Sequence, residues 1–399
     1  MNILQLCNKP PYPPVDGGTM AMHCFTQGLL EAGHNVKVLA VSTNKHPVRR
    51  EQMTEEYVRQ TEFEAVYIDL RPHVVGAAVA MLSGESYNVK RYESENFEKK
   101  LREVLERGQY DIVQIEGLYL TPYVPTIRKH SEAKIVLRAH NVESEIWHRL
   151  AKSSPCSIKR MYLKHLALTL EAYEREHLND YDGVVAITDN DTRRFGEMGC
   201  RRAMATIGFG IEPEEIDNIE VEANTLFHIG SMDWKPNEEG IRWFLDKVWP
   251  MVHKQMPQVR LYLAGRKMPE DLLRKQIEGV SVVGEVADAM YFIGSKQINI
   301  VPLKSGSGMR VKIIEAMAAG KAVVTTTVGA QGIKYKDGEN LLIADTPEAF
   351  VEQIRRCVEE AGYAQQIGKR AYETIVREYN PKRLTEELTQ FYLTLQDKQ

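Results

Sequence analysis

Residues 305–324 constrain the fold of this chain more than any other segment. Small residues at 305–308 separate an apolar run at 298–303 from a helical pattern that begins near position 311, and a second apolar run follows at 321–327. This order of strand, glycine loop, helix and strand is typical of a βαβ unit in a parallel sheet. Glycines let a backbone approach a ligand, and the free N–H groups of a helix start favour an anion. The segment therefore predicts a phosphate-binding loop at the carboxyl end of a strand.

Short apolar runs recur along both halves of the chain, as expected for strands buried on both faces of a parallel sheet. In the first half they lie at 2–7, 35–41, 63–70, 110–116, 133–140 and 182–188. In the second half they lie at 225–230, 259–265, 280–284, 298–303, 322–327 and 341–344. The pattern predicts an α/β protein of two Rossmann-like, doubly wound domains that face each other across a cleft.

The chain has 399 residues, which exceeds what one hydrophobic core usually supports. An acidic connection that contains a proline, at 211–217, suggests the division between the two domains. We therefore expect one domain at 1–213 and a second at 214–381. The last segment, 382–399, has helical periodicity, and we expect a helix that can cross back to the first domain.

Composition excludes several classes of protein. A net charge of −4 argues against a dedicated nucleic-acid surface. No apolar run approaches the ~20 residues that span a bilayer, and residues 1–7 lack the features of a secretory signal, so we expect a cytoplasmic protein. The five cysteines are scattered, and Asp189 and Asp191 are interpreted as helix-start residues, so no metal site is predicted.

Four segments together resemble glycosyltransferase family 4: residues 11–19, 138–143, 227–237 and 305–332. The resemblance implies the GT-B fold and a retaining transfer of a sugar from a nucleotide diphosphate sugar, with no cofactor and no required metal. It also implies that the second domain binds the donor and that the first domain contacts the acceptor.

The 305–324 segment resembles the family's motif of two glutamates separated by seven residues. Glu315 matches the second glutamate, which implies a hydrogen bond to the nucleotide ribose. Ser307 stands where the first glutamate is expected, so contacts to the transferred sugar must come from hydroxyl and backbone groups. The alternative for Glu315 is a salt bridge with Lys312, one turn earlier.

The departing diphosphate needs more stabilisation than a helix start provides. A helix terminus typically contributes ~0.3–1 kcal/mol, whereas a preorganised donor at a developing charge contributes ~3–4 kcal/mol. We therefore expect Gly308, Met309 and Arg310 to surround the phosphates, and Lys312 to be the principal cation. Arg310 can equally be a solvated surface residue.

Three further residues are assigned to the donor site. Lys235 is a weaker phosphate candidate, because it lies where the family has a lysine after the opening strand of the second domain. Arg266 follows a predicted strand and can border the nucleotide, although a surface position is the alternative. Val286 ends a segment that resembles the loop whose backbone contacts the base, so the base itself is not identified.

The first domain has two candidate sites. The resemblance places His140 next to the donor sugar, where it would hydrogen-bond and orient the reactants and would hold no metal; a buried structural histidine is the alternative. Together with Lys312 and Glu315 it forms our catalytic set. Gly17 and Gly18 precede a predicted helix whose N–H groups can contact a ligand, unless Asp16 and these glycines only cap that helix.

The acceptor is expected to be a saccharide or a lipid-linked saccharide. The irregular region 71–83 is the predicted acceptor surface, and a basic cluster suits either an anionic lipid-linked acceptor or peripheral contact with the inner face of the membrane. A solvated helix face is the alternative for that cluster, which consists of Lys152, Lys159, Arg160, Lys164 and His165. Two other functions stay open: a nucleotide-sugar epimerase of the same fold and a catalytically silent saccharide-binding protein.

Overall fold

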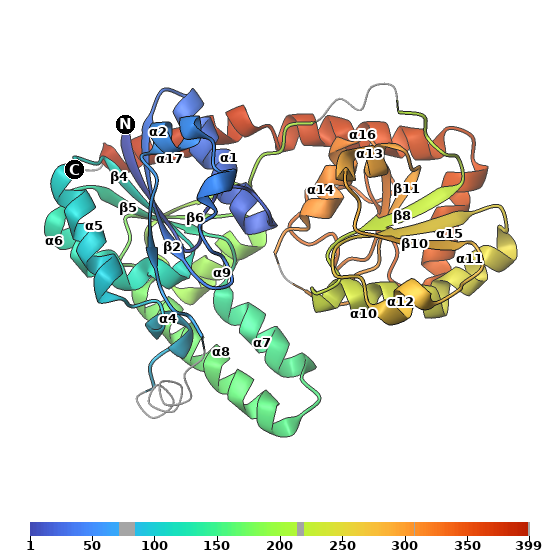
Figure 1. The fold of residues 1–399 in the computed structure, drawn as a ribbon, viewed down its shortest axis with the longest axis horizontal. Helices are drawn as coiled ribbons and strands as arrows, with labels where there is room; N and C mark the ends of the chain where they lie inside the picture. The colour runs from blue at the N-terminus through green and yellow to red at the C-terminus, as the bar shows by residue number, and fades with distance from the viewer. Residues whose placement is uncertain (72–83, 214–218, 307, 398–399) are drawn as a thin grey trace. The chain divides into compact units, whose positions relative to one another are not determined.

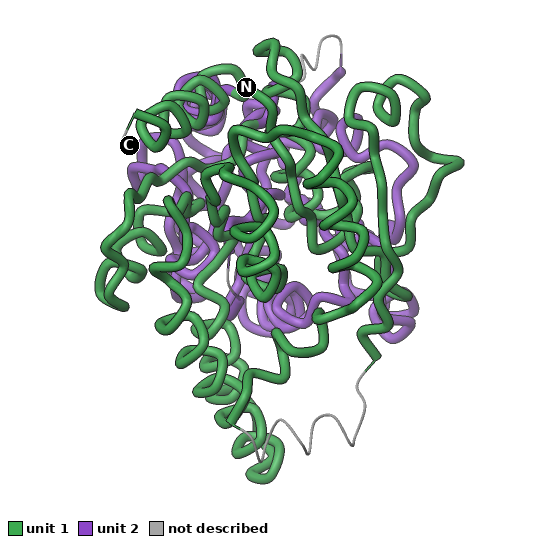
Figure 2. Tube along the Cα trace, turned by 90° about the vertical axis from the view of Figure 1, so that its left-hand side faces the viewer, with its two compact units in different colours: residues 1–210, 381–399 green, residues 211–380 purple. Residues whose placement is uncertain are grey.

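The computed structural model describes residues 1–71, 84–213, 219–306 and 308–397. The chain forms two compact units. Unit 1 contains Met1–Gly210 and Pro381–Gln399, and unit 2 contains Ile211–Asn380. Figure 2 shows that both ends of the chain lie in unit 1. The expected acceptor region lies outside the described residues except for Arg71, and Ser307 also lies outside them.

Within the described residues, the sheet of unit 1 has seven parallel strands in the order β3-β2-β1-β4-β5-β6-β7. The strands are β1 (Asn2–Cys7), β2 (Asn35–Ser42), β3 (Glu64–Tyr67), β4 (Ile112–Glu116), β5 (Lys134–Ala139), β6 (Gly183–Ala186) and β7 (Ala203–Thr206). The central strands β1 and β4 are buried along almost their whole length, because helices cover both faces of the sheet (Figure 1). The short β7 was not predicted, since its Ala-Met-Ala-Thr sequence carries little strand signal.

The helices of unit 1 come from the first part of the chain, except for α17, which is formed by the last residues. They are α1 (Gly17–Glu31), η1 (Arg50–Gln52), α2 (Glu55–Thr61), α4 (Tyr87–Lys90), α5 (Glu95–Arg107), η2 (Leu118–Tyr123), α6 (Val124–His130), α7 (Glu143–Ser153), α8 (Ser157–His177), α9 (Asp189–Met198) and α17 (Pro381–Gln396). The last helix, α17, packs against α1. Its Tyr392 also donates a hydrogen bond to Gln114 of the central strand β4, so the end of the chain belongs to this unit.

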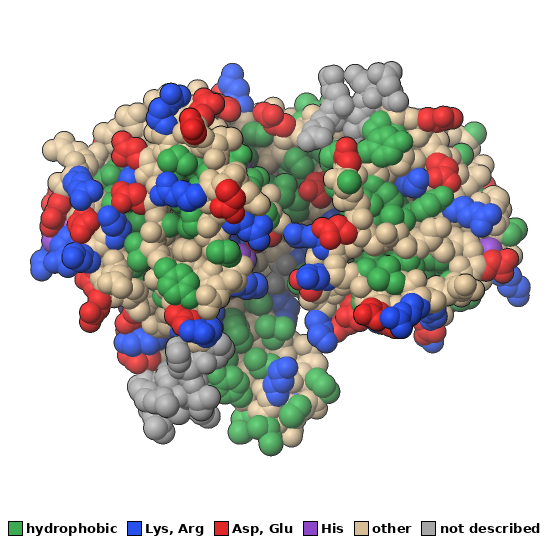
Figure 3. Space-filling view, in the orientation of Figure 1, with side chains coloured by type: hydrophobic (Ala, Val, Ile, Leu, Met, Phe, Trp, Pro, Cys, Tyr) green, Lys and Arg blue, Asp and Glu red, His purple; other side chains and the backbone are tan. Residues whose placement is uncertain are grey.

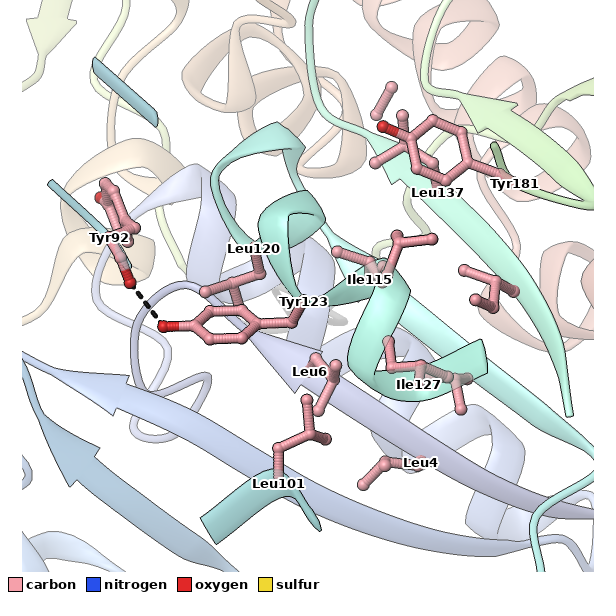
Figure 4. Close-up of a cluster of buried hydrophobic side chains, with 14 of the residues drawn as sticks. Leu4, Leu6, Tyr92, Leu101, Ile115, Leu120, Tyr123, Ile127, Leu137 and Tyr181 are labelled. Carbon is pink, nitrogen blue, oxygen red and sulfur yellow. Dashed lines mark hydrogen bonds between the residues drawn. The ribbon is translucent and has the colours of Figure 1, made fainter. Parts of the chain in front are cut away.

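One layer of the core of unit 1 lies between the sheet and α5 and α6. Figure 4 shows Leu4, Ile115, Leu101 and Ile127 meeting in this layer. At its edge the hydroxyl of Tyr123 donates to the carbonyl of Tyr92 over 2.7 Å, which satisfies a polar group that burial would otherwise leave unpaired.

Unit 2 repeats the same plan with six parallel strands among its described residues, in the order β10-β9-β8-β11-β12-β13. The strands are β8 (Thr225–Ile229), β9 (Arg260–Ala264), β10 (Val280–Gly284), β11 (Ile298–Val301), β12 (Ala322–Thr325) and β13 (Leu342–Ile343). The helices are α10 (Lys235–Trp243), α11 (Trp249–Gln255), α12 (Glu270–Arg274), α13 (Ala289–Gly294), α14 (Val311–Ala318), α15 (Pro347–Glu359) and α16 (Tyr363–Glu378), with a π-helical turn, Phe244–Val248, joining α10 to α11.

The order of the strands locates the binding edge of each unit. Both sheets run outward from a central pair, β1 and β4 in unit 1 and β8 and β11 in unit 2, which is the doubly wound arrangement. Ligands bind such sheets at the carboxyl ends of these central strands. The structure therefore confirms two Rossmann-like α/β domains and directs attention to the residues that follow β1, β4, β5, β8 and β11.

Candidate functional site

In unit 2 a glycine turn joins the carboxyl end of β11 to α14. Gly306 has φ of 123° and Gly308 has φ of 76°, which are backbone conformations that residues with a side chain rarely adopt. The indole of Trp234 lies against this turn, since a Cβ atom added at Gly306 would come within 3.0 Å of it. The turn leads directly into the first residue of α14, Val311, so the free N–H groups of that helix start beside it.

Two cations lie at the start of α14. Arg310 is buried, and its guanidinium carbon lies 5.6 Å from the centre of the Trp234 ring. Lys312 is partly buried, lies 5.6 Å from the same ring, and donates a hydrogen bond to the side-chain oxygen of Asn237. The amide of Asn237 in turn donates to the carbonyl of Ser231 over 2.7 Å, which fixes its oxygen toward the lysine. These contacts bring two cationic groups together beside the glycine turn.

Gly230, which follows β8, leaves room for the lysine. A Cβ atom added at Gly230 would lie 2.6 Å from the Nζ atom of Lys312 and 2.9 Å from the amide nitrogen of Asn237. Both distances are shorter than real contacts of a Cβ atom. The absence of a side chain at this strand end is therefore what admits the ammonium group of Lys312.

Burial lowers the pKa of two basic side chains near Gly230, those of Lys312 and His228. It lowers the pKa of Lys312 to about 7, and the charge of Arg310 adds to this effect while that of Glu315 opposes it. Burial, with the charge of Lys312, also lowers the pKa of His228 to about 3, so this histidine is neutral and its Nδ1–H donates to the carbonyl of Ile300 over 2.8 Å. An anion that bound beside Lys312 would favour its charged form, which burial and Arg310 disfavour.

The other residues predicted for the donor site lie at the same edge of the sheet but outside these contacts. Lys235 is the exposed first residue of α10, and Arg266 is exposed just after β9, where its carbonyl accepts from the N–H of Met232 over 2.9 Å. Val286 and Met309 are partly buried, and Glu315 is partly buried on the second turn of α14. Among the described candidates, the structure thus brings Gly308, Arg310 and Lys312 together.

In unit 1 the imidazole of His140 is paired with a buried carboxylate. His140 follows β5, and its Nε2 atom lies 2.7 Å from Oε2 of Glu116, the last residue of β4. Glu116 is fully buried and also accepts from the side-chain amide of Gln5 over 2.8 Å. The guanidinium of Arg138 lies 3.8 Å from the same carboxylate.

The surroundings keep Glu116 ionised. Burial alone would raise its pKa, but the hydrogen bond and charge of His140, the charge of Arg138 and the hydrogen bond from Gln5 outweigh burial and lower it. Since an ionised carboxylate only accepts hydrogen bonds, Nε2 of His140 must carry the proton and donate it. The pair therefore fixes the orientation of the imidazole ring and leaves Nδ1 as its second polar atom.

The glycines at the start of the chain lie in the first turn of α1. Asp16 caps this helix by accepting from the N–H of Thr19 over 2.9 Å, and it also pairs with Lys9 at 2.6 Å. Gly18 packs against that lysine, since an added Cβ atom would lie 3.0 Å from its Nζ atom. The capping role weighed for Asp16 is therefore present, and Lys9 adds a cation close to Gly17 and Gly18.

Acidic residues that could suggest a metal have structural roles. Asp189 and Asp191 begin α9, where Thr188 is the cap and exchanges a hydrogen bond with Asp191. The buried carboxylate of Glu174 accepts from the N–H groups of Glu143 and Ser144 at the start of α7, and burial raises its pKa to about 7. Across the part of the chain that the structure describes, no group of three or more histidine, cysteine or acidic residues could hold a metal ion.

Comparison with known proteins shows which fold these units build. Sucrose-phosphate synthase from Thermosynechococcus elongatus superposes with a TM-score of 0.72, at 15% identity and over 100% of both chains. HepE from Anabaena, in complex with UDP, superposes with a TM-score of 0.65, at 14% identity, over 99% of this chain and 100% of that one. The fold is GT-B.

Sequence comparison places the likeness most firmly in unit 2 of this GT-B chain. Residues 223–360 match the model of the family described as Glycosyl transferases group 1. A relative from Klebsiella pneumoniae, described as an uncharacterized 44.6 kDa protein in the cps region, is 22% identical over 393 residues, which are 96% of this chain and 97% of the relative. Among the helices that the structure describes, none has both the length and the apolar character needed to cross a membrane.

Sequence reasoning gave no role to Glu116, Asn237, Trp234 and Lys9. Glu116 could have been found, because a carboxylate at the end of a predicted central strand shares an edge with His140 on the next strand. Asn237 and Trp234 lie in the 227–237 segment, but nothing in their spacing indicates a partner that is 75 positions away, as Lys312 is. The position of Lys9 next to Asp16 was equally hard to predict, since it depends on the path of the loop before α1.

Proposed function

We propose that this protein is a retaining glycosyltransferase that moves a sugar from a nucleotide diphosphate sugar to a saccharide or lipid-linked saccharide acceptor. One observation carries the proposal: Lys312 and buried Arg310 lie together beside a glycine turn at the start of α14. Such a site suits the two charges of a diphosphate. The family match over 223–360 includes these residues and supports this assignment.

The donor nucleotide is assigned to unit 2. Lys312 and the first N–H groups of α14 would stabilise the diphosphate as the bond to the sugar breaks, and each preorganised donor of this kind contributes ~3–4 kcal/mol. The carboxylate of Glu315, one turn further along the helix, would accept hydrogen bonds from the ribose hydroxyls. Structures of HepE with UDP and with UDP-glucose support a nucleotide sugar as the donor.

The groups that contact the sugar and the acceptor are assigned to unit 1. In a retaining transfer the acceptor hydroxyl forms the new bond on the face from which the diphosphate departs, and its proton passes to the departing phosphate oxygen. His140, held by Glu116 through Nε2, would form a hydrogen bond with a sugar hydroxyl through Nδ1 and so orient the donor. In this proposal the cations at the start of α14 stabilise the departing diphosphate, without a metal or another resident cofactor.

A role in polysaccharide synthesis fits the known relative. The Klebsiella pneumoniae protein lies in a cps region and covers nearly the whole chain, which supports a saccharide acceptor. A lipid-linked saccharide is the form of acceptor that suits the basic cluster named from the sequence. Neither an epimerase nor a silent saccharide-binding protein is favoured by a particular contact in the structure.

A thermal-shift screen of nucleotide sugars, followed by transfer assays with the best ligand, tests the proposal. A ligand at 100 times its Kd adds about 2.7 kcal/mol to the stability of the folded state, which is readily seen as a rise in Tm. We expect one nucleotide sugar to stabilise the protein, Glu315→Ala to weaken that effect, and the product to keep the anomeric configuration of the donor by NMR. Interconversion of free nucleotide sugars would identify an epimerase, and sugar binding without release of nucleotide would identify a silent module; either result would overturn the proposal.

A further inference from the structure

The helices α7 and α8 form a hairpin that extends beyond the sheet of unit 1 (Figure 1). Its base is anchored, because Leu166 and Leu170 of α8 are buried against α4 and η2 and Glu174 caps α7. Its tip is closed by Arg160, whose guanidinium donates twice to the carbonyl of Ser154, at 3.0 and 2.8 Å. The hairpin therefore presents a well-defined tip away from the core of its unit.

The tip exposes large apolar side chains. Ile158 and Met161 are 75% and 64% exposed, which are the highest values among the large apolar residues that the structure describes. Leu150, near the end of α7, is 47% exposed, and Leu168, nearer the base of the hairpin, is 49% exposed. Ile158, Met161 and Leu168 stand at positions i, i+3 and i+10 of α8, which places them along one side of the helix. The outer side of α8 is therefore an apolar stripe that faces solvent.

The outer part of the hairpin, residues 146–170, carries formal charge of one sign. Residues 146–170 contain no Asp or Glu, although 55 such residues in a chain of 399 would place about three in a stretch of this length. The stretch contains five basic residues: Arg149, Lys152, Lys159, Arg160 and Lys164. Figure 3 shows basic side chains beside the apolar surface of this protrusion. A chain with a net charge of −4 thus concentrates positive charge at one tip.

The lysines of this stretch differ from the arginines of α15. On α15, Arg355 pairs with Glu352 and Glu359, and Arg356 pairs with Glu360, as is typical of a solvated helix face. Lys152, Lys159 and Lys164 lie in the stretch without Asp or Glu, and none of them forms an ion pair with a carboxylate among the residues that the structure describes. The hairpin therefore offers unpaired positive charge next to exposed apolar groups.

We propose that the α7–α8 tip docks on the surface of an anionic phospholipid bilayer. The lysines would contact lipid headgroups, and Ile158 and Met161 would enter the boundary of the acyl chains. A second copy of the chain is a poorer occupant, because it would bring another tip of the same charge against this one. Docking does not depend on the proposed reaction, since it requires neither donor nor acceptor.

Co-sedimentation of the full chain with vesicles tests the proposal. We expect binding to phosphatidylcholine vesicles that contain phosphatidylglycerol, little binding to phosphatidylcholine alone, and release as salt rises. Replacing Lys152, Lys159 and Lys164 with Glu should reduce binding by roughly tenfold or more. The same change at three exposed lysines of unit 2, Lys254, Lys275 and Lys369, is the matched control and should leave binding nearly unchanged.

A second pair of variants tests the apolar stripe. Ile158→Ser with Met161→Ser should weaken binding by severalfold and leave Tm unchanged, because both side chains are exposed. The control is Leu273→Ser with Tyr291→Ser, which removes apolar groups that are exposed in unit 2. Equal binding by the hairpin variants and their controls would overturn the proposal, as would the absence of binding to anionic vesicles.

The depth of the tip can be measured with the native sequence. Cys156 lies in the connection between α7 and α8 and is exposed, whereas Cys7 and Cys357 are buried. A polarity-sensitive fluorophore on Cys156 should shift to shorter wavelength on anionic vesicles, and a Cys156→Ser chain corrects for other labelled thiols. A protein that forms a dimer through this tip, and whose label shifts on dimerisation but not with vesicles, would show that a second copy is the occupant and would overturn membrane docking.

Discussion

At the carboxyl edge of the unit 1 sheet, the buried carboxylate of Glu116 lies beside the basic side chains of His140 and Arg138. At the same edge of the unit 2 sheet, the partly buried Lys312 lies beside a second cation, Arg310, and donates to the neutral amide of Asn237. The pKa of Glu116 is lowered, so its ionised form is favoured in place. The pKa of Lys312 is lowered to about 7, so its charged form is disfavoured in place.

This difference indicates what each edge can do. A charge that already has its partner holds a neighbouring ring in one orientation and adds to stability. A partly buried cation beside a second cation lowers stability, and an anion that binds next to it offsets this cost. Two sheets with the same strand order therefore differ at this edge: unit 1 holds a positioned imidazole, and unit 2 holds two cations beside a glycine turn.

The largest expected effect comes from removing the cation of unit 2. Lys312→Met keeps most of the volume of the side chain but removes its charge, so the departing diphosphate loses a preorganised donor. We expect turnover to fall by about 10²–10³-fold, or ~3–4 kcal/mol, with little change in Tm. Lys235→Met is the control, because Lys235 is exposed at the start of α10. Equal losses in the two variants would contradict the distinction between these lysines.

The next effect breaks the ion pair of unit 1. Glu116→Gln keeps the shape of the side chain but leaves His140 and Arg138 without a carboxylate, and we expect the free energy of unfolding to fall by ~1.5–3 kcal/mol. The folded pKa of Glu116 is below its ordinary value of 4.5, so this contribution is complete above that pH and is lost as the pH falls through the folded pKa. Chemical denaturation of both proteins at pH 7 and in acid measures it.

A surface pair provides the control for this change. Glu106 lies 3.4 Å from the Nδ1 atom of His130, and its side chain is 58% exposed. Glu106→Gln should change stability by less than about 0.5 kcal/mol, because exposed pairs contribute little. If the two variants were equally destabilised, the buried pair would contribute no more to the stability of unit 1 than an exposed pair does.

The architecture was predictable from the sequence, because buried parallel strands leave continuous apolar runs. The runs at 2–7, 110–116 and 298–303 correspond to β1, β4 and β11, and the glycines at 306 and 308 do precede a helix. The exception, β7, has only four residues and few that favour a strand. Its place at the edge of the sheet is decided by pairing with β6, a tertiary contact that local pattern does not encode.

The partners within each site were less predictable. Lys312 could be named because it follows the glycine loop, and His140 because the family resemblance implies a histidine at the end of its strand. Their partners, Asn237 and Glu116, come from other βα units, and their side chains meet only after the sheets have formed. The roles of the residues in the reaction stay predictions, and the variants described here address them.

A smaller effect is expected when the space for Lys312 is filled. In Gly230→Ala the new Cβ atom would lie 2.6 Å from the Nζ atom of Lys312, so the ammonium group must move. Since the end of a flexible side chain moves at little cost, we expect a small change in Tm but a roughly tenfold loss of donor affinity, which is about 1.4 kcal/mol. Gly196→Ala is the control, because its added Cβ atom meets Met204 at an ordinary 3.7 Å.

The pH dependence of donor binding is the smallest and most specific effect. Lys312 has a pKa of about 7 in the free protein, and a bound diphosphate raises that pKa, so binding takes up a proton above pH 7. The affinity for a nucleotide sugar should fall about threefold between pH 6.5 and 7.5 as the free lysine loses its proton. His228, with a pKa of about 3, is neutral throughout this range and does not contribute.

Isothermal titration in two buffers with different enthalpies of ionisation would measure this uptake directly. A nucleotide sugar is a better probe than a nucleotide diphosphate, whose terminal phosphate itself titrates with a pKa near 6. In Lys312→Met the affinity should be lower and independent of pH. A wild-type affinity that is constant from pH 6.5 to 7.5 would mean that Lys312 does not bind the diphosphate as a cation, and would remove the contrast between the two edges.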